Sequence, residues 1–175
     1  PVAIPGSNLP LSAAGVLILW LGWFGFNGGS VLSADPALTS LTLVTTCLAA
    51  AAGGIACALT AKLVYGTLDI TMFMNGVLGG LVGITAGADQ MLPWEAIAIG
   101  AIAGPIVLGG VALLDKAKLD DPVGAIPVHL FCGMWGTLAV GIFGGLASGG
   151  QILIQLGVIG IAGIFCCVGA GLIVL

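Results

Sequence analysis

The stretch "LGWFGFNGGS", residues 21–30, sets bulky aromatic rings among glycines and ends in a polar Asn and Ser. It lies inside residues 1–34, which carry no charged side chain, and a bilayer crossing needs only about 20 mostly apolar residues. At the 3.6-residue period of a helix, Trp23, Phe26 and Ser30 fall on one face. The stretch therefore predicts a membrane-spanning helix with a specialised face, beside glycines that let neighbouring backbones approach: Gly25, Gly28 and Gly29.

The whole chain shares this apolar character. Hydrophobic residues make up 59% of the sequence and charged residues 6%, against roughly 25% charged residues in an average soluble domain. The mean hydropathy is +1.27. We therefore predict an integral membrane protein. Apart from His129, its charge-free blocks are residues 1–34, 36–61, 70–88, 96–114 and 122–175.

These blocks are interpreted as helices, because a membrane interior admits only helices or closed barrels and the period-two alternation of barrel strands is absent from the sequence. The last block is long enough for two spans and is broken at "ASGGQ", residues 147–151. We predict an all-α, polytopic membrane helix bundle that forms a single transmembrane domain over residues 1–175. Its six helices are expected over residues 11–33, 36–61, 70–88, 96–114, 124–147 and 151–175.

The basic residues predict the orientation of these spans. With six spans, both chain ends lie on one side, and all three basic residues fall in loops on that same side: Lys62, Lys116 and Lys118. Loops rich in Lys and Arg remain in the cytoplasm, so the chain ends are predicted to be cytoplasmic. The outer loops then contain Asp35, Asp89 and Glu95.

Several other classes of protein are disfavoured. A net charge of −4 argues against a partner nucleic acid, which binds clustered Lys and Arg. The five cysteines lie in apolar spans without metal-ligand spacing and are interpreted as small buried hydrophobes. No phosphate loop, dinucleotide fingerprint or zinc motif is present, so we expect neither an enzyme nor a bound metal or cofactor.

Glycine supplies 31 of the 175 residues, as expected where membrane helices must touch without a hydrophobic driving force between them. On the third span the glycines recur at intervals of three and four residues and form one smooth face, and the fifth span has a similar pattern. We interpret both faces as helix-packing surfaces. Their members are Gly76, Gly80, Gly83 and Gly87, and Gly133, Gly136, Gly141 and Gly144.

Two polar features surround the start of the fifth span. Asp121, before a proline, suits a helix N-terminus, so Asp120 and Asp121 are interpreted as structural caps rather than metal ligands. His129 is the one histidine, and an ionisable group in an apolar span is a candidate functional residue. A neutral imidazole bonded to a backbone carbonyl is the alternative, and this residue alone does not decide between them.

Both ends of the chain look cut. The sequence begins at a proline without a charged leader segment, so it is not interpreted as starting with a signal peptide. It stops at "GLIVL", inside an apolar run. We expect a part of a larger polypeptide, or one chain of a split one.

Three stretches together resemble the ammonium transporters, also called methylammonium permeases and related to Rhesus glycoproteins. They are "NLPLSAAGVLILWLGWFGFNGGS", "NGVLGGLVGITAGAD" and "DDPVGAIPVHLFCGMWGTLAVGIF". The resemblance implies helices six to eleven of an eleven-helix fold, which are one of two inverted repeats and a peripheral last helix. It also implies a homotrimer in the plasma or inner membrane, with one pore per subunit and cytoplasmic ends for this chain.

The resemblance also implies roles for single residues. Phe26 corresponds to one of two stacked phenylalanines that close the outer mouth of the pore. Ser30 corresponds to the serine of the outer ammonium-recruitment site, and Trp23 to a tryptophan that lines the pore below it. His129 corresponds to the second of two paired histidines and would act as a proton relay and ammonia ligand. Asp121 matches the loop before helix ten.

The function that the resemblance implies is ammonium transport, in which the cation is recruited and deprotonated and ammonia crosses a hydrophobic pore. The other histidine and the other gate phenylalanine belong to helices one to five, so that N-terminal half is an expected partner, besides lipid and a PII-type regulator. Two alternatives stay open. One is the membrane ammonium sensor of a signalling protein, and the other is a structural membrane subunit that no longer conducts.

Overall fold

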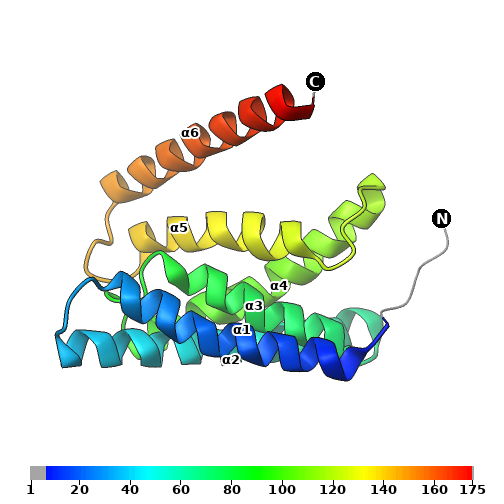
Figure 1. The fold of residues 1–175 in the computed structure, drawn as a ribbon, viewed down its shortest axis with the longest axis horizontal. Coiled ribbons are helices and arrows are strands. Elements are labelled where there is room, and N and C mark those ends of the chain that lie inside the picture. Colours follow the sequence, from blue (N-terminus) through cyan, green and yellow to red (C-terminus); the bar gives the residue numbers. More distant parts are fainter. Residues whose placement is uncertain (1–6, 175) are drawn as a thin grey trace.

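The computed structural model describes residues 7–174, and these residues form helices and the turns that join them. The predicted all-α class and the six helices are confirmed (Figure 1). A π-helical segment, η1, runs directly into the fifth helix. The bounds are α1 (Leu9–Ser30), α2 (Pro36–Tyr65), α3 (Ile70–Thr85), α4 (Pro93–Ala117), η1 (Ile126–Phe131), α5 (Cys132–Ile142) and α6 (Gly149–Val174).

Four of these helices, α1, α2, α4 and α6, are long and apolar enough to cross a membrane. The third and fifth are shorter than predicted. α3 ends at Thr85 rather than at residue 88, because the chain turns there and the Gly87 N–H bonds to the Ile84 carbonyl. α5 ends at Ile142 rather than at residue 147, since Phe143 is extended and Gly144 has a φ of 75°. The composition and these spans describe a multi-pass membrane protein.

Side chains next to the helices explain where several of them begin and end. The first backbone N–H groups of a helix lack helical partners, and in three helices a side chain just before the first turn accepts hydrogen bonds from them. These side chains are Asn8 before α1, Asp35 before α2 and Asp69 before α3. Gly66 ends α2 in the left-handed conformation with a φ of 77°, which glycine adopts without steric cost. Local chemistry therefore fixes these boundaries.

The core is a close three-helix contact among α2, α3 and α4 (Figure 1). A methyl group added at Gly76 would meet the carbonyl oxygen of Gly53, and one added at Gly80 or Gly100 would meet that of Ala49. The backbones therefore approach too closely for any larger residue. The predicted packing role is confirmed for these two glycines of the third span, and small residues take the place of large side chains at the centre of the bundle.

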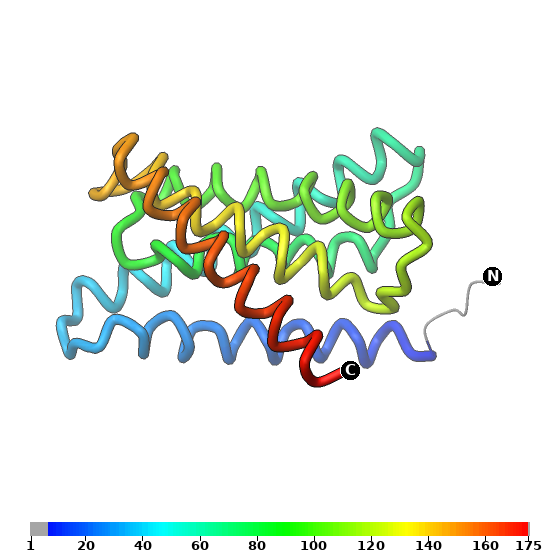
Figure 2. Tube along the Cα trace, turned by 90° about the horizontal axis from the view of Figure 1, so that it is seen from above, coloured from blue at the N-terminus to red at the C-terminus, as the bar shows by residue number. Residues whose placement is uncertain are grey.

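α1 and α6 lie at the edges of this core. Asn27 is the one buried residue of α1, and no residue of α6 is buried. α6 contacts only α5 among the described helices, and it runs obliquely away from the bundle in Figure 1 and crosses over it obliquely in Figure 2. The prediction of buried cysteines is therefore wrong for three of five. Cys57 and Cys132 are buried, whereas Cys47 lies on an exposed face of α2. Cys166 and Cys167 are exposed because no residue of α6 is buried in the described chain.

Candidate functional site

The C-terminal half of α1 presents two aromatic rings in edge-to-face contact. The ring centroids of Trp23 and Phe26 lie 5.8 Å apart at an interplanar angle of 80°. Phe26 remains 57% exposed, so its ring is free to meet another group. The Trp23 indole N–H donates to the Thr85 hydroxyl of α3 at 2.9 Å, which fixes the ring against the core.

Ser30 completes this face one turn further along the helix. Its hydroxyl donates to the Phe26 carbonyl oxygen at 2.7 Å, and the side chain is exposed. A serine hydroxyl carries one donor hydrogen and two acceptor lone pairs. Because the hydrogen is already used within the helix, Ser30 can offer only acceptor lone pairs to a ligand. The structure therefore brings Trp23, Phe26 and Ser30 together.

Asn27 lies in the same segment, and the sequence reasoning did not single it out. It is only 3% exposed, and its amide nitrogen donates to the Thr46 hydroxyl at 3.0 Å. The amide oxygen is buried without a hydrogen-bond partner among the described residues. An amide side chain within an uncharged, apolar stretch is the signal that could have identified it.

A polar recess of about 220 Å³ lies behind this face, between the ends of α1 and α3 and the start of α2. Five of its lining residues have polar side chains, and one of them is a carboxylate. The lining residues are Asn27, Ser30, Val31, Thr42, Thr85, Ala86, Ala88 and Asp89. The recess therefore concentrates oxygen atoms near the half-buried Trp23, whose indole N–H donates to Thr85 of the lining.

His129 lies in η1, where the backbone is wound more loosely than in an α-helix. Single π-helical turns inside helices are frequent at functional sites. The imidazole is exposed, and it forms no hydrogen bond within residues 7–174. The alternative of an imidazole bonded to a backbone carbonyl thus finds no such bond in the described part of the chain.

Asp121 holds the start of η1. Its two carboxylate oxygens accept from the backbone N–H groups of Ala125 and Ile126, each at 2.8 Å. Gly124 turns the chain with a φ of 72° between the carboxylate and the helix. These contacts place the backbone from which His129 projects. No group of three or more His, Cys, Asp or Glu side chains over residues 7–174 could hold a metal ion.

The two parts of the expected site do not touch. α1 makes no contact with η1 in the described chain, whereas α3 contacts both of them. Figure 1 shows α3 between α1 and α5, and Figure 2 shows α1 along one edge of the bundle. Trp23, Phe26 and Ser30 therefore form one cluster, and His129 stands apart on another exposed surface.

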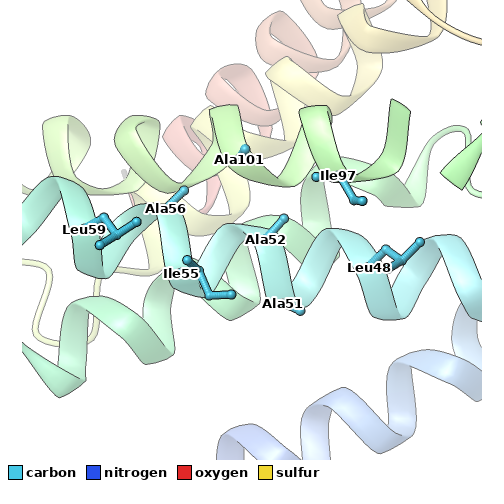
Figure 3. Close-up of a pocket in the computed structure, with 8 residues that line it drawn as sticks. All are labelled: Leu48, Ala51, Ala52, Ile55, Ala56, Leu59, Ile97 and Ala101. Atoms are coloured by element: carbon cyan, nitrogen blue, oxygen red, sulfur yellow. The ribbon is translucent and has the colours of Figure 1, made fainter. Parts of the chain in front are cut away.

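A second hollow, of about 440 Å³, lies open between α2 and α4 (Figure 3). Its side chains are all alanine, leucine or isoleucine, and none of the predicted site residues lines it. It offers no group that could bind a polar ligand or move a proton. The lining residues are Leu48, Ala51, Ala52, Ile55, Ala56, Leu59, Ile97 and Ala101.

Comparison with known proteins gives one family. The sequence profile described as the Ammonium Transporter Family matches residues 1–174. Ammonium transporter Amt2 of Archaeoglobus fulgidus is 50% identical over 143 residues, which cover 82% of this chain and 31% of that protein. Ammonium transporter Amt2 of Methanocaldococcus jannaschii is 37% identical over 177 residues, which cover 98% of this chain and 40% of that protein.

Solved structures agree with this result. A protein described as Sensor Amt Protein superimposes with a TM-score of 0.81 at 35% identity, over 91% of this chain and 40% of that one. Mep2 of Saccharomyces cerevisiae superimposes with a TM-score of 0.79 at 29% identity, over 85% of this chain and 38% of that one. The chain thus spans well under half the length of the proteins it matches.

Proposed function

Because this chain belongs to the ammonium transporter family, we propose that it is the C-terminal half of a membrane transporter that recruits ammonium, removes a proton and conducts ammonia. The observation that carries the proposal is the family match over residues 1–174. In this role the chain supplies one inverted repeat and a peripheral last helix, and an N-terminal half supplies the other repeat. The family is one of transporters and not of enzymes.

The exposed surfaces support a pore shared between two halves. Phe26 and His129 both project from apolar helices without a covering partner in the described chain. Large exposed apolar surfaces mark contacts with lipid or with other protein segments. The missing half would bring the second phenylalanine against Phe26 and the second histidine against His129.

Dehydration is the physical problem that such a pore must solve. Moving an isolated cation into a dry, low-dielectric channel costs on the order of tens of kcal/mol. Aromatic faces at Trp23 and Phe26 and the lone pairs of Ser30 replace part of the lost water, and a cation–π contact contributes about 0.5 to 2 kcal/mol. This is far too little to carry the charge across, so the ammonium must lose a proton before it enters the apolar segment.

His129 is suited to the conducting part of the path. An imidazole can donate at one ring nitrogen and accept at the other, and it exchanges protons near neutral pH. Burial in an apolar pore disfavours the charged ring, so a neutral pair of imidazoles can relay a proton and bind ammonia without becoming a fixed cation. Asp121 serves this function indirectly, because its carboxylate holds the first turn of η1.

The assembly follows from the same proposal. The transporter is a homotrimer with one pore per subunit in the plasma or inner membrane, and both ends of this chain lie in the cytoplasm. The C-terminal ends of α2 and α4, which carry Lys62, Lys116 and Lys118, then face the cytoplasm, where a PII-type regulator would have access to them. Ser30 and Asp89 accordingly lie toward the outer surface.

A membrane ammonium sensor is the second candidate, and one observation favours it. The Sensor Amt Protein superimposes over 91% of this chain. In a sensor the same recruitment site would bind ammonium and report it to a cytoplasmic domain. The activity of the complete protein separates the two, because a transporter moves ammonium through liposomes and a pure sensor does not.

The proposal is tested with the complete protein that contains this chain, reconstituted in liposomes. His129→Ala is expected to abolish ammonium-selective uptake, whereas Val123→Ala, in an exposed loop nearby, is expected to leave it intact. Transport and potassium rejection are measured together. Unchanged uptake and unchanged rejection of potassium in His129→Ala would contradict the role of His129.

A further inference from the structure

One face of α3 is open in this chain and joins the two separate parts of the candidate site. From Met74 to Thr85, the residues that are not buried are Asn75, Leu78, Val82 and Thr85. We propose that this open face is one wall of the conduction path and that Leu78 and Val82 determine which amines can pass. The inference rests on the proposed function and deepens it, because it assigns size selectivity to named residues of α3.

The four residues of the open face form one stripe along the helix. They recur at intervals of three, four and three residues. This spacing places side chains on one face of an α-helix. Every other residue from Met74 to Thr85 is buried. The stripe is therefore the side of α3 that no other helix of the described chain covers.

The two ends of the stripe contact the two parts of the site. At one end, the Thr85 hydroxyl accepts from the indole N–H of Trp23 at 2.9 Å. At the other end, a methyl group added at Gly124, in the turn before η1, would lie 2.8 Å from the amide nitrogen of Asn75. The ends are ten residues apart, which is about 15 Å of helix at about 1.5 Å per residue. Figure 1 shows α3 between α1 and α5, as this arrangement requires.

Leu78 lies in the middle of the stripe, at the level of His129. It packs against a buried cluster that Trp23 also covers, and against a second cluster that contains Val128 and Cys132. These last two residues stand on either side of His129 in the chain. Among the described residues, Leu78 is the one partly buried side chain that packs against both clusters. It therefore lies between the aromatic pair and the segment that carries the imidazole.

The middle of the stripe is apolar, whereas its ends are polar. Val82 borders α5, because a methyl group added at Gly133 would lie 3.8 Å from its Cγ1 atom. Neither Leu78 nor Val82 has a hydrogen-bonding group, so a cation beside them would lose hydration without gaining a hydrogen bond, which is strongly unfavourable. Neutral ammonia has no charge to dehydrate. The wall therefore suits the neutral amine on its way past His129.

The same two side chains are held rigidly enough to discriminate by size. Val82 is β-branched and has one strongly preferred rotamer in a helix. The helix backbone beneath them is fixed by the close contacts of Gly76 and Gly80 with α2. A fixed apolar wall cannot move aside for an extra methyl group. Ammonia would thus pass more readily than methylamine, and a smaller side chain at residue 78 would reduce this difference.

The transport test measures the ratio of methylammonium to ammonium uptake by the complete protein in liposomes. Leu78→Ala is expected to raise this ratio severalfold, up to about tenfold, since one methyl group in a fitted apolar site changes discrimination by about that factor. Leu78→Phe should lower it. Val77→Ala is the matched control, because Val77 is the adjacent residue and is only 2% exposed. The ratio does not depend on how much protein folds. Equal ratios in Leu78→Ala and Val77→Ala would overturn the proposal.

A structure of the complete protein tests the wall without any transport measurement. We expect a continuous narrow passage in front of Leu78 and Val82, with the N-terminal half on its far side. Side chains of that half packed directly onto both residues would leave no passage and would overturn the proposal. If instead the wild-type protein fails to move ammonium, the proposed function fails, while the structure still decides whether α3 borders a passage.

Discussion

The indole nitrogen of Trp23 and the hydroxyl of Thr85 form a hydrogen bond of 2.9 Å between residues 62 positions apart in the sequence. Thr85 in turn donates to the Leu81 carbonyl within α3. The orientation of the Trp23 ring, and with it the edge-to-face contact with Phe26, is therefore set by α3 rather than by α1 alone. The exposed aromatic face depends on the core to which it is bonded.

Thr85→Val tests this dependence. The change keeps the shape of the side chain but leaves the part-buried indole N–H without its acceptor, which costs about 1 to 3 kcal/mol. We expect a lower melting temperature for the complete protein in detergent and weaker ammonium uptake, with Thr85→Ser close to wild type. A valine variant as stable as the serine variant would show that this bond contributes little.

Phe26→Ala addresses the proposed gate. Removal of an exposed ring should widen the outer constriction while leaving the protein folded, because Phe26 is not part of the buried core. We expect altered conduction or selectivity in liposomes, and no recovery of uptake when the change is combined with His129→Ala. Wild-type conduction and selectivity in the single variant would mean that Phe26 is not a gate.

Two glycines of α4 separate backbone packing from helix propensity. A methyl group at Gly100 would meet the backbone of Ala49, whereas one at Gly109 would meet no atom within 4 Å. Gly100→Ala is therefore expected to destabilise the protein by about 1 to 3 kcal/mol or more through overpacking. Gly109→Ala should be neutral or stabilising by up to about 1 kcal/mol, since alanine favours a helix. Melting temperatures and expression levels provide the comparison.

How far the sequence predicts this fold is clearest from the glycines. The spacing of Gly76 and Gly80 identified a packing face, and both touch α2. The same reasoning predicted close neighbours for Gly25, Gly28 and Gly29, but only Gly28 meets one, the Leu43 side chain. The spacing of residues along a helix predicts which of them share a face. It does not predict which other helix packs against that face, because that depends on tertiary contacts.

The candidate site was predictable only in part. Motif resemblance placed Trp23, Phe26 and Ser30, and helical geometry put them on one face. It did not identify Thr85 or Asn27, because their roles arise from hydrogen bonds between helices. Nor did it predict the π-helical winding at His129, since a change of backbone register has no clear signature in a single sequence.

Asp69 should make the stability of the protein depend on acid pH. Its carboxylate accepts from the Thr71 hydroxyl at 2.6 Å and from the Thr71 and Met72 backbone N–H groups at 2.7 and 3.3 Å. These bonds, the hydroxyl above all, lower the pKa of Asp69 below its ordinary value of 3.8. The unfolded chain thus takes up this proton at a higher pH than the folded protein does.

The sign of the effect follows from that difference. Stabilisation by ionised Asp69 is complete well above pH 3.8 and is lost as the pH falls through the lowered pKa of the folded state. Asp69→Asn, which keeps a capping side chain, should flatten the loss of stability in acid. Melting temperatures of both proteins are measured from neutral pH downward. A difference between them that does not vary with pH would contradict this role.

Glu95 joins two turns that are distant in the sequence. One carboxylate oxygen accepts from the Leu92 N–H at 2.7 Å at the start of α4, and the other accepts from the Gly144 N–H at 3.3 Å after α5. The residue is only 8% exposed, so water cannot readily replace either contact. The adjacent Trp94 and Phe143 rings stack edge to face with centroids 6.2 Å apart, which ties the same two turns together.

Glu95→Gln keeps the size of the side chain but leaves one carbonyl oxygen where the carboxylate has two acceptors. One of the two backbone N–H groups must then face an amide NH2, and the loss of a hydrogen bond to a charged group costs about 1.5 to 3 kcal/mol. Since the Gly144 bond is the longer one, we expect it to break first. Hydrogen exchange should accelerate at residues 143–148 more than at the start of α4. Equal acceleration at both turns would mean that Glu95 holds the α4 start and the α5–α6 turn equally.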